Sequence, residues 1–325
     1  MADAYATTTT LASAIKSRYY DQLFLRLADK KLVHKQLGQL NRKVGQGEGG
    51  YGSQVLYWTK WVNLAVVSTS ATGEGVATSA LTFSAMTVTG TTAQYDNAVS
   101  ISDIAAYASF GDVMKGAVER LAYNAGLSID TIIRNTIRSS GTQQSASAVA
   151  YWSAVPAGAN LTIGEVRKAS RTLLANDAQE QDDGSWVAVV HPHALYDLQG
   201  DSTTGGWIDA NKYADAGKLL TAEAGKLMGV RFLVTSNAAT RGSSYDTVSA
   251  VVASSTIYVT SVFGKDAFGV SELQALKTYV KPFGSAGTAD PTDKIATAGW
   301  KTLFGANVLN SAFFVNINHT VSSTA

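Results

Sequence analysis

The sequence contains no cysteine, which excludes disulfide bridges and thiolate chemistry for this chain. Charge is also scarce, because Asp, Glu, Lys and Arg make up 16% of the 325 residues, against about 25% in a typical soluble domain. Much of the surface must therefore consist of Ser, Thr, Ala, Gly and Asn. Such a surface is typical of a protein that buries much of itself in assembly contacts, and equally of a secreted protein rich in β-structure.

Long apolar runs are missing as well. No window approaches 18 consecutive apolar residues, so we expect no membrane span. The N-terminal segment, MADAYATTTTLASAIKSRYY, has no apolar run of the signal-peptide type, so we expect no secretion signal. The chain exceeds the size that one hydrophobic core usually serves, which predicts two lobes.

Catalytic motifs are absent too. The sequence has four histidines and no Gly-x-Ser-x-Gly elbow, His-Glu-x-x-His pair or Gly-Lys-Ser/Thr phosphate loop. His191 and His193 flank Pro192, which favours a strand-to-helix turn, so we expect them to cap the helix or lie at the surface. The sequence therefore predicts that the protein is not an enzyme and has no catalytic residue, no cofactor-binding residue and no metal ligand.

The net charge of +1 argues against a dedicated nucleic-acid binder held by phosphate neutralisation. The charge is uneven, however: residues 1–60 hold nine Lys or Arg and four Asp or Glu, whereas the remainder holds 17 and 21. Two interpretations of the basic N-terminal part remain open. It is either a solvated helix face or a surface that meets an acidic partner.

Two segments have strong helical periodicity. Apolar residues recur every four positions over Leu11–Leu37, and Gly38 follows as a stop signal. A second helix is predicted from its N-cap Asp112 to Arg138, a rod of roughly 40 Å that braces the molecule. The residues expected to pack along this rod include Met114, Val118, Leu121 and Ile132.

Between these helices, residues 46–96 predict a two-stranded ribbon with a polar tip. The alternating apolar positions are Val55, Tyr57 and, after a slip, Trp61 and Val62, then Leu81, Phe83, Met86 and Val88. An isolated hairpin is at best marginally stable in water, and its open edges aggregate unless covered. The ribbon therefore rests either on its own chain or on a neighbouring copy. The aromatic residues available for such a contact are Tyr51, Tyr57, Trp58 and Trp61.

The second half of the chain predicts shorter elements. Residues 139–160 are expected to be a linker, and Thr162 with Glu165 predicts a capping box at the start of a helix. Helices and strands then alternate without the regularity of a doubly wound sheet, so the predicted fold class is α+β. The further expected elements are a strand at Trp186–Val190, a helix from Pro192 through Leu198, a helix near Leu219–Met228, and strands at Gly229–Val234, Thr247–Ala253, Thr256–Thr260, Leu273–Val280 and Lys301–Asn318.

A series of short motifs occurs in an order and spacing that resembles the major capsid proteins of tailed bacteriophages. They are Glu74-Gly75-Val76, Gln94-Tyr95, Ile101-Ser102-Asp103, Asp130, His191-Pro192, Asp197-Leu198, Gly229-Val230-Arg231-Phe232, Val262-Phe263-Gly264, Ala267-Phe268-Gly269, Asp290-Pro291, Gly299-Trp300-Lys301 and Leu309-Asn310. The resemblance covers nearly the whole chain. Within the family it is closest to the branch typified by the Enterobacteria phage N-four capsid protein, although GKLMG at 225–229 replaces a more acidic version.

The resemblance implies the tailed-phage (Hong Kong-type) major capsid fold. Its parts would be an N-terminal arm with an amphipathic helix (1–45), an extended E-loop ribbon (46–96), a peripheral P-domain with a long spine helix (97–159), an axial A-domain (160–275) and C-terminal strands returning to the P-domain (276–325). It also implies a structural protein that forms hexamers and pentamers in an icosahedral head around double-stranded DNA. The implied contacts to a neighbouring subunit are Tyr51, Tyr57, Trp58, Trp61 and Glu74.

The resemblance further implies a set of partners. These are a portal protein, a scaffolding protein, a decoration protein as a further candidate, and packaged DNA that is contacted non-specifically, with no membrane. A helix that begins near residue 11 leaves no room for a cleavable scaffolding segment, so a separate scaffold is expected. The protein would belong to the virion after assembly in the host bacterial cytoplasm. The alternative is a secreted or surface β-rich adhesin, against which the missing signal peptide and the long helix count.

Overall fold

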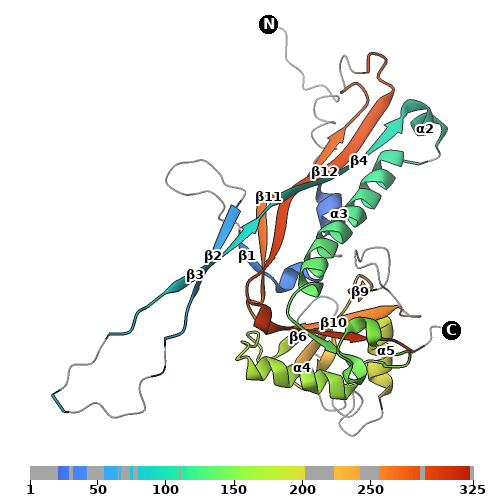
Figure 1. Cartoon of the computed structure of the whole chain (residues 1–325). Helices are drawn as coiled ribbons and strands as arrows, with labels where there is room; N and C mark the ends of the chain where they lie inside the picture. The colour runs from blue at the N-terminus through green and yellow to red at the C-terminus, as the bar shows by residue number, and fades with distance from the viewer. Residues whose placement is uncertain are drawn as a thin grey trace.

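The chain combines two β-sheets, a projecting two-stranded ribbon and one long helix that reaches from one sheet to the other (Figure 1). The computed structural model describes residues 21–28, 32–41, 55–64, 66, 74–75, 80–109, 111–201, 223–241, 256–285 and 290–322. The upper body is a four-stranded sheet in the order β1-β11-β12-β4. The lower lobe is a seven-stranded sheet in the order β5-β13-β10-β6-β8-β7, with β9 also paired to β10. This arrangement confirms the predicted α+β class.

The strands are β1 (Gln39–Asn41), β2 (Val55–Trp61), β3 (Ala85–Thr91), β4 (Ala93–Ser102), β5 (Thr142–Ser145), β6 (Trp186–Val190), β7 (Glu223–Leu227), β8 (Val230–Val234), β9 (Thr240–Arg241), β10 (Ile257–Phe263), β11 (Phe268–Lys281), β12 (Ile295–Val308) and β13 (Phe314–His319). The helices are α2 (Asp103–Ala108), α3 (Val113–Arg138), α4 (Ile163–Ala175) and α5 (Pro192–Gly200). Residues 21–28 are also helical, and 3-10 turns form at Lys35–Leu37, Ala146–Ala148, Trp152–Ala154 and Ser311–Phe313.

The upper body buries one face of its sheet against α3 and the helical segment 21–28. Along β12 the side chains alternate, so that Ala298 and Trp300 point to this face and are buried. They form one apolar cluster with Phe24 of the N-terminal segment and with Val118 and Leu121 of α3. This apolar cluster thus joins three parts of the chain that are far apart in the sequence.

The long helix α3 has 26 residues and lies where the sequence predicts it. Its N-cap is Asp112, whose carboxylate accepts a hydrogen bond from the backbone N of Lys115 at 3.1 Å. The helix changes partner along its length: Leu121 packs in the upper body, whereas Ile133 packs in a cluster shared with the lower lobe. None of the described helices is both long enough and apolar enough to cross a membrane.

The lower lobe has helices on both faces of its sheet. Helices α4 and α5 cover one face, and the C-terminal part of α3 covers the other. For this reason all five residues of β6, WVAVV, are buried, and β6 pairs in parallel with β8. The predicted strand at Trp186–Val190 and the helix that follows it are confirmed.

The N-terminal helix differs from the prediction of one helix over Leu11–Leu37. Residues 21–28 are helical, but residues 32–34 are not, and a separate 3-10 turn follows at Lys35–Leu37. The reason is tertiary, because the backbone N and the imidazole of His34 both bond to the carboxylate of Asp130 on α3. The predicted residues 11–20 lie outside the described part of the chain.

Helix α4 begins at the predicted position without the predicted capping box. The Thr162 side chain makes no capping hydrogen bond. The Glu165 carboxylate instead accepts hydrogen bonds from Lys168 at 2.7 Å and from Gln144 at 2.6 Å. A second carboxylate, that of Asp201, accepts from the backbone N of Ile163 at 3.2 Å and serves the helix start.

Three further predictions are wrong in the type or the division of an element. The expected linker at 139–160 contains strand β5, which pairs in parallel with β13. The helix expected near Leu219–Met228 is strand β7 where the structure describes it. The single strand expected at Lys301–Asn318 is divided into β12 and β13 by a 3-10 turn capped by Asn310. The strand expected at Thr247–Ala253 lies outside the described residues.

The packing of α3 can be tested at Leu121, which is 4% exposed. We expect Leu121→Ala to lower the free energy of unfolding by about 2–5 kcal/mol, because a buried leucine is replaced by a cavity. Tyr123→Ala is the control on the same helix, since Tyr123 is 48% exposed, and its effect should be far smaller. Urea denaturation followed by circular dichroism measures both. Equal losses of stability would contradict the described packing.

Candidate assembly interface

The ribbon of β2 and β3 leaves the body as an antiparallel pair, in which Trp58 is opposite Val88 (Figure 1). Its two faces have opposite environments near the body. Leu56 and Trp58 are 1% and 8% exposed, whereas Tyr57 and Trp61 are 60% and 59% exposed. The sequence predicts the ribbon correctly but groups Val55 and Tyr57 as its apolar face. The structure instead buries the alternate positions, Leu56 and Trp58. A shift of one residue along a strand turns every side chain to the opposite face.

The exposed face of the ribbon is aromatic. The rings of Trp61 and Phe83 stack with centroids 4.6 Å apart and an interplanar angle of 15°, and both side chains are about 60% exposed. Tyr57 lies on the same face of β2, four cross-strand pairs closer to the body than Trp61. Aromatic side chains in water are costly to leave uncovered and are enriched at the centres of protein interfaces. This face is therefore the best candidate for contact with another molecule.

The covered face of the ribbon is anchored by Trp58. The indole packs against Gly269 on β11 and Gly90 on β3, and a Cβ atom at Gly269 would lie 2.8 Å from the ring. The close approach needs glycine at both positions. Trp58 Nε1 and Asn307 Nδ2 are buried at this anchor and find no hydrogen-bond acceptor among the described residues, which costs free energy. Trp58, expected among the contacts to a neighbour, is thus mostly used within its own chain.

The other expected site residues fall into different environments. Tyr51 lies outside the described residues, and Glu74 is exposed in a turn with Gly75. Of the four residues that the sequence predicts to pack along α3, Val118 and Leu121 are fully buried. Met114 and Ile132 are half-buried, and Ile133 and Ile137 take the innermost positions beside the lower lobe.

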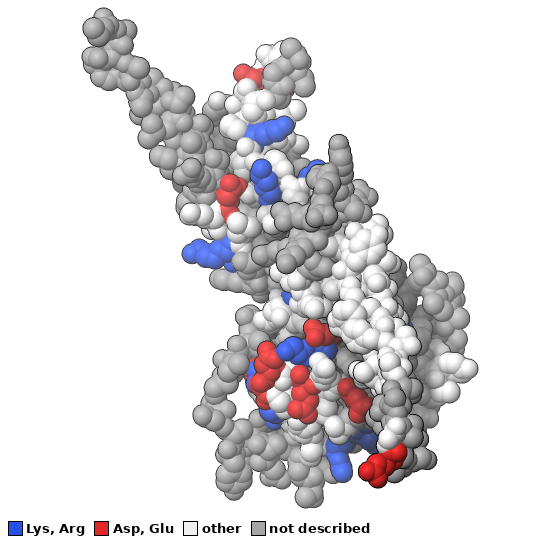
Figure 2. Space-filling view, turned by 90° about the vertical axis from the view of Figure 1, so that its left-hand side faces the viewer, with Lys and Arg blue, Asp and Glu red and all other residues white. Residues whose placement is uncertain are grey.

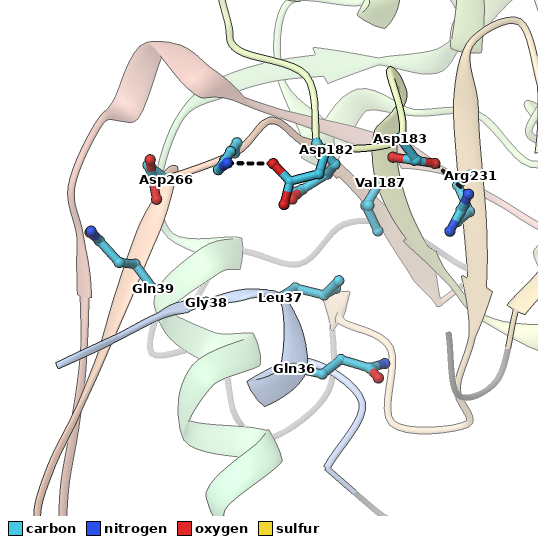
Figure 3. Close-up of a pocket in the computed structure, with 11 residues that line it drawn as sticks. Gln36, Leu37, Gly38, Gln39, Asp182, Asp183, Val187, Arg231 and Asp266 are labelled. Carbon is cyan, nitrogen blue, oxygen red and sulfur yellow. Dashed lines mark hydrogen bonds and ion pairs between the residues drawn. The ribbon is translucent and has the colours of Figure 1, made fainter. Parts of the chain in front are cut away.

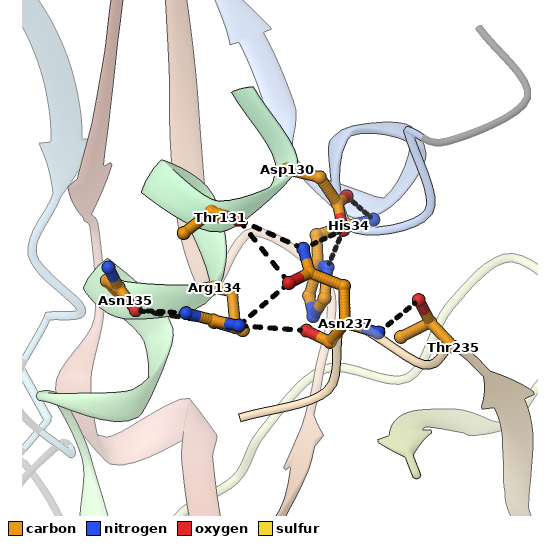
Figure 4. Close-up of polar contacts among 7 residues, drawn as sticks. All are labelled: His34, Asp130, Thr131, Arg134, Asn135, Thr235 and Asn237. Atoms are coloured by element: carbon orange, nitrogen blue, oxygen red, sulfur yellow. Dashed lines mark hydrogen bonds and ion pairs between the residues drawn. The ribbon is translucent and has the colours of Figure 1, made fainter. Parts of the chain in front are cut away.

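A buried polar junction ties the N-terminal segment, α3 and the lower lobe together (Figure 4). The carboxylate of Asp130, which is fully buried, accepts from the backbone N of His34 at 2.8 Å and lies 2.9 Å from its Nδ1. It also accepts from Nδ2 of Asn237 at 3.0 Å. Arg134 completes the junction by donating to Oδ1 of Asn237 at 2.7 Å. Burial of the Asp130 carboxylate is tolerated because His34 and Asn237 donate hydrogen bonds to it.

A cavity of about 300 Å³ lies beside this junction, between the N-terminal segment and the lower lobe (Figure 3). Most of its charged wall residues are paired, Arg231 with Asp183 and Glu223, and Lys265 with Asp182, and Asp266 also lines the cavity. Burial raises the pKa of Asp183, but the hydrogen bond from Ser185 and the charge of Arg231 outweigh it and lower the pKa overall. The two cations of the cavity wall, Arg231 and Lys265, are thus engaged in ion pairs.

The histidine pair at 191 and 193 starts α5, as the sequence predicts. Nδ1 of His191 accepts a hydrogen bond from the backbone N of His193 at 3.2 Å, so His191 is the N-cap. Within the described residues, no group of three or more His, Cys, Asp or Glu side chains is placed to hold a metal ion. The surface charge of the lower lobe is of both signs. Figure 2 shows acidic and basic side chains interleaved over the lower lobe on the face in view.

The fold is shared with several solved phage capsids. Comparison with the capsid of Ralstonia phage GP4 gives a TM-score of 0.69 at 10% identity, covering 89% of this chain and 88% of that chain. The capsid of cyanophage Pam1 gives 0.61 at 15% identity, with 88% and 89% covered. The capsid of cyanophage P-SCSP1u gives 0.59 at 15% identity, with 90% and 89% covered. No model of a protein family matches the sequence, and no curated protein does.

These similarities extend over most of each chain and establish the class of structure. The chain has the tailed-phage major capsid fold, as its sequence resemblance implies. The junction at Asp130 was not predicted. The sequence places Asp130 only among the motifs of the resemblance, and nothing local indicates that His34 and Asn237 would meet it.

The ribbon anchor can be tested with two glycines. Gly269→Ala should lower the free energy of unfolding by about 1–3 kcal/mol, because the new methyl group overlaps the indole of Trp58. Gly116→Ala in α3 is the matched control: nothing lies within 4 Å of its Cβ position, and the helix should gain about 0.5–1 kcal/mol. Thermal denaturation measures both. A Gly269→Ala protein as stable as the control would mean that Trp58 is not anchored there.

Proposed function

We propose that this chain is the major capsid protein of a tailed phage, which self-assembles as hexamers and pentamers into an icosahedral head around double-stranded DNA. One observation carries the proposal: a chain with the capsid fold over most of its length leaves one face of its projecting ribbon aromatic and exposed. The stacked pair Trp61 and Phe83 needs a covering surface, and a neighbouring subunit supplies it. Tyr57 extends the same contact toward the body, and Tyr51 and Glu74 are proposed as further contacts to the neighbour on the sequence resemblance alone.

Within this proposal each part of the chain has a mechanical role. The upper body with α3 is the peripheral domain, the lower lobe is the axial domain, and the ribbon is the E-loop that overlaps a neighbour. The expected division at residues 275 and 276 falls inside β11, which pairs with β12 in the upper body, whereas β13 of the expected return segment pairs with β10 in the lower lobe. The junction at Asp130 holds the two domains at a set angle, because its partners come from both.

The finer identity rests on the sequence motifs. We place the chain in the branch typified by the Enterobacteria phage N-four capsid protein, on the order and spacing of those motifs. The corresponding partners are a portal protein, a separate scaffolding protein, a decoration protein as a further candidate, and the packaged DNA. Assembly would take place in the host bacterial cytoplasm, and the protein has a structural and not an enzymatic role. A β-rich adhesin is not favoured, since the fold matches capsids throughout.

The proposal predicts that the exposed ribbon face acts between subunits. Trp61→Ala combined with Phe83→Ala should leave a folded subunit with unchanged circular dichroism, because both rings are about 60% exposed. The protein concentration needed for shells should rise by at least about tenfold, since a hot-spot residue at a protein interface costs about 2 kcal/mol or more when it is truncated to alanine. Light scattering and electron microscopy of assembly with the scaffolding protein provide the measurement.

Tyr151→Ala is the control for this experiment, because Tyr151 is 73% exposed but lies far along the chain in the lower lobe. It should assemble like the unmodified protein. Shells of normal yield and heat resistance from the double variant would show that the exposed face of the ribbon is not part of the interface between subunits. An unfolded double variant would show that the two rings pack on their own chain instead.

A further inference from the structure

Three of the four histidines of the chain gather around one tyrosine of the lower lobe. The ring centroids of His191 and Tyr258 are 4.8 Å apart, those of His193 and Tyr258 are 6.3 Å apart, and those of His319 and Tyr258 are 6.4 Å apart. His191 and His193 are themselves 4.8 Å apart. The rings come from the start of α5, from β10 and from β13, so the cluster joins three elements. The proposed capsid function makes no use of it.

The innermost member, His319, is fully buried and held in one neutral tautomer. Its Nδ1 lies 2.9 Å from the carbonyl oxygen of Thr320, which only accepts, so Nδ1 carries the proton. Its Nε2 lies 2.9 Å from the hydroxyl of Thr260 on β10 and accepts from it. Both ring nitrogens are therefore satisfied without a charge. A second proton on the ring would force the bond with Thr260 to reverse, so that Nε2 donates to the hydroxyl oxygen, and would place a cation in a buried site.

The outer member, His191, is also bonded in its neutral form. Its Nδ1 accepts from the backbone N of His193, which caps the start of α5. A protonated Nδ1 has no lone pair left for this bond. The added positive charge would also lie at a helix N-terminus, where the macrodipole disfavours cations. Protonation of His191 thus removes the cap and repels the first turn of α5.

The charged groups around the cluster offer little compensation. Asp197 of α5 is the carboxylate that faces His319, but it accepts from the backbone N of Ser322 at 2.8 Å and from the Ser322 hydroxyl. Arg241 of β9, the strand paired with β10, donates to Oδ1 of Asn318 at 2.9 Å. The positive charge of Arg241 therefore lies beside β13. Among the described residues packed here, Asp197 is thus the one acid that favours a charged His319.

The titration of the two histidines follows this geometry. Burial and then the charge of His193 lower the pKa of His191 below 6.5. Burial lowers the pKa of His319 to about 4, although Thr320 and Asp197 act in the opposite direction. In the unfolded chain both side chains titrate near their ordinary value, about 6.5. The unfolded state therefore binds more protons below that pH, so the contribution of the cluster to stability is complete above about pH 6.5 and is lost as the pH falls toward 4.

We propose that the cluster of His191, His193, Tyr258 and His319 is an acid-sensitive lock, which holds α5 and the C-terminal strand β13 against β10 at neutral pH and releases them in mild acid. Release would free Ser322 from Asp197 and uncap α5 while the upper body remains folded. The lock is a property of the single chain, so it stands whether or not the chain forms a shell.

Hydrogen exchange of the full chain at pH 7.5 and pH 5.0, corrected for the intrinsic effect of pH, tests the lock. Protection of the amides in α5 and at 314–322 should fall by at least about tenfold at pH 5.0, because one pKa unit is worth a factor of ten. Protection in α3 should change much less. A uniform loss over the whole chain, or no loss at α5 and β13, would overturn the proposal.

Two variants separate the lock from general acid sensitivity. His191→Asn keeps a neutral N-cap, since asparagine is among the preferred residues there, and removes the titrating ring. It should reduce the acid-induced loss of protection in α5 severalfold, whereas the control Tyr196→Phe, on the exposed side of α5, should retain it in full. Equal loss in both variants would overturn the proposal. The imidazole resonances of His191 and His319, followed by NMR from pH 7.5 to 4.5, give a second measurement that needs no variant: midpoints near 6.5 for both would also overturn it.

Discussion

The fold depends on α3, which has to be covered by two different sheets at once. Its first half packs on the upper body through Val118 and Leu121, and its second half packs on the lower lobe through Ile133 and Ile137. A single rigid rod shared by two cores sets the distance and the angle between them. The buried carboxylate of Asp130 adds direction to this apolar contact, since its hydrogen bonds to His34 and Asn237 form only in one arrangement.

In the proposed function, the ribbon is an arm prepared for contact with a neighbouring subunit. Near the body, Trp58 fixes its root through the close approach of Gly90 and Gly269, at the cost of two buried donors that find no acceptor among the described residues. Beyond that point Trp61 and Phe83 stack on each other, and both side chains remain about 60% exposed. A stable root with an uncovered aromatic face suits an arm that is positioned before its partner arrives, which lowers the entropy lost on binding.

How far the sequence predicts the structure depends on the range of the interactions involved. Helix α3 and its cap Asp112, strand β6, and the start of α5 at His191 were predicted correctly, because periodicity and capping act within a few residues. The N-terminal helix was predicted too long, because the bonds of His34 to Asp130 override its local preference. Strand β5 was missed, since its ladder partner β13 lies more than 170 residues away.

The sequence by itself determined the α+β class, the ribbon, the long helix and, through the order of its motifs, the capsid fold. Only the tertiary structure decided which face of the ribbon is covered, which residue of α3 lies innermost, and how the histidines meet around Tyr258. The physical reason is the same in each case. A period of 2 or 3.6 identifies an amphipathic element, but the face that becomes buried depends on a surface supplied by distant residues, here Gly269 for Trp58 and β13 for Tyr258.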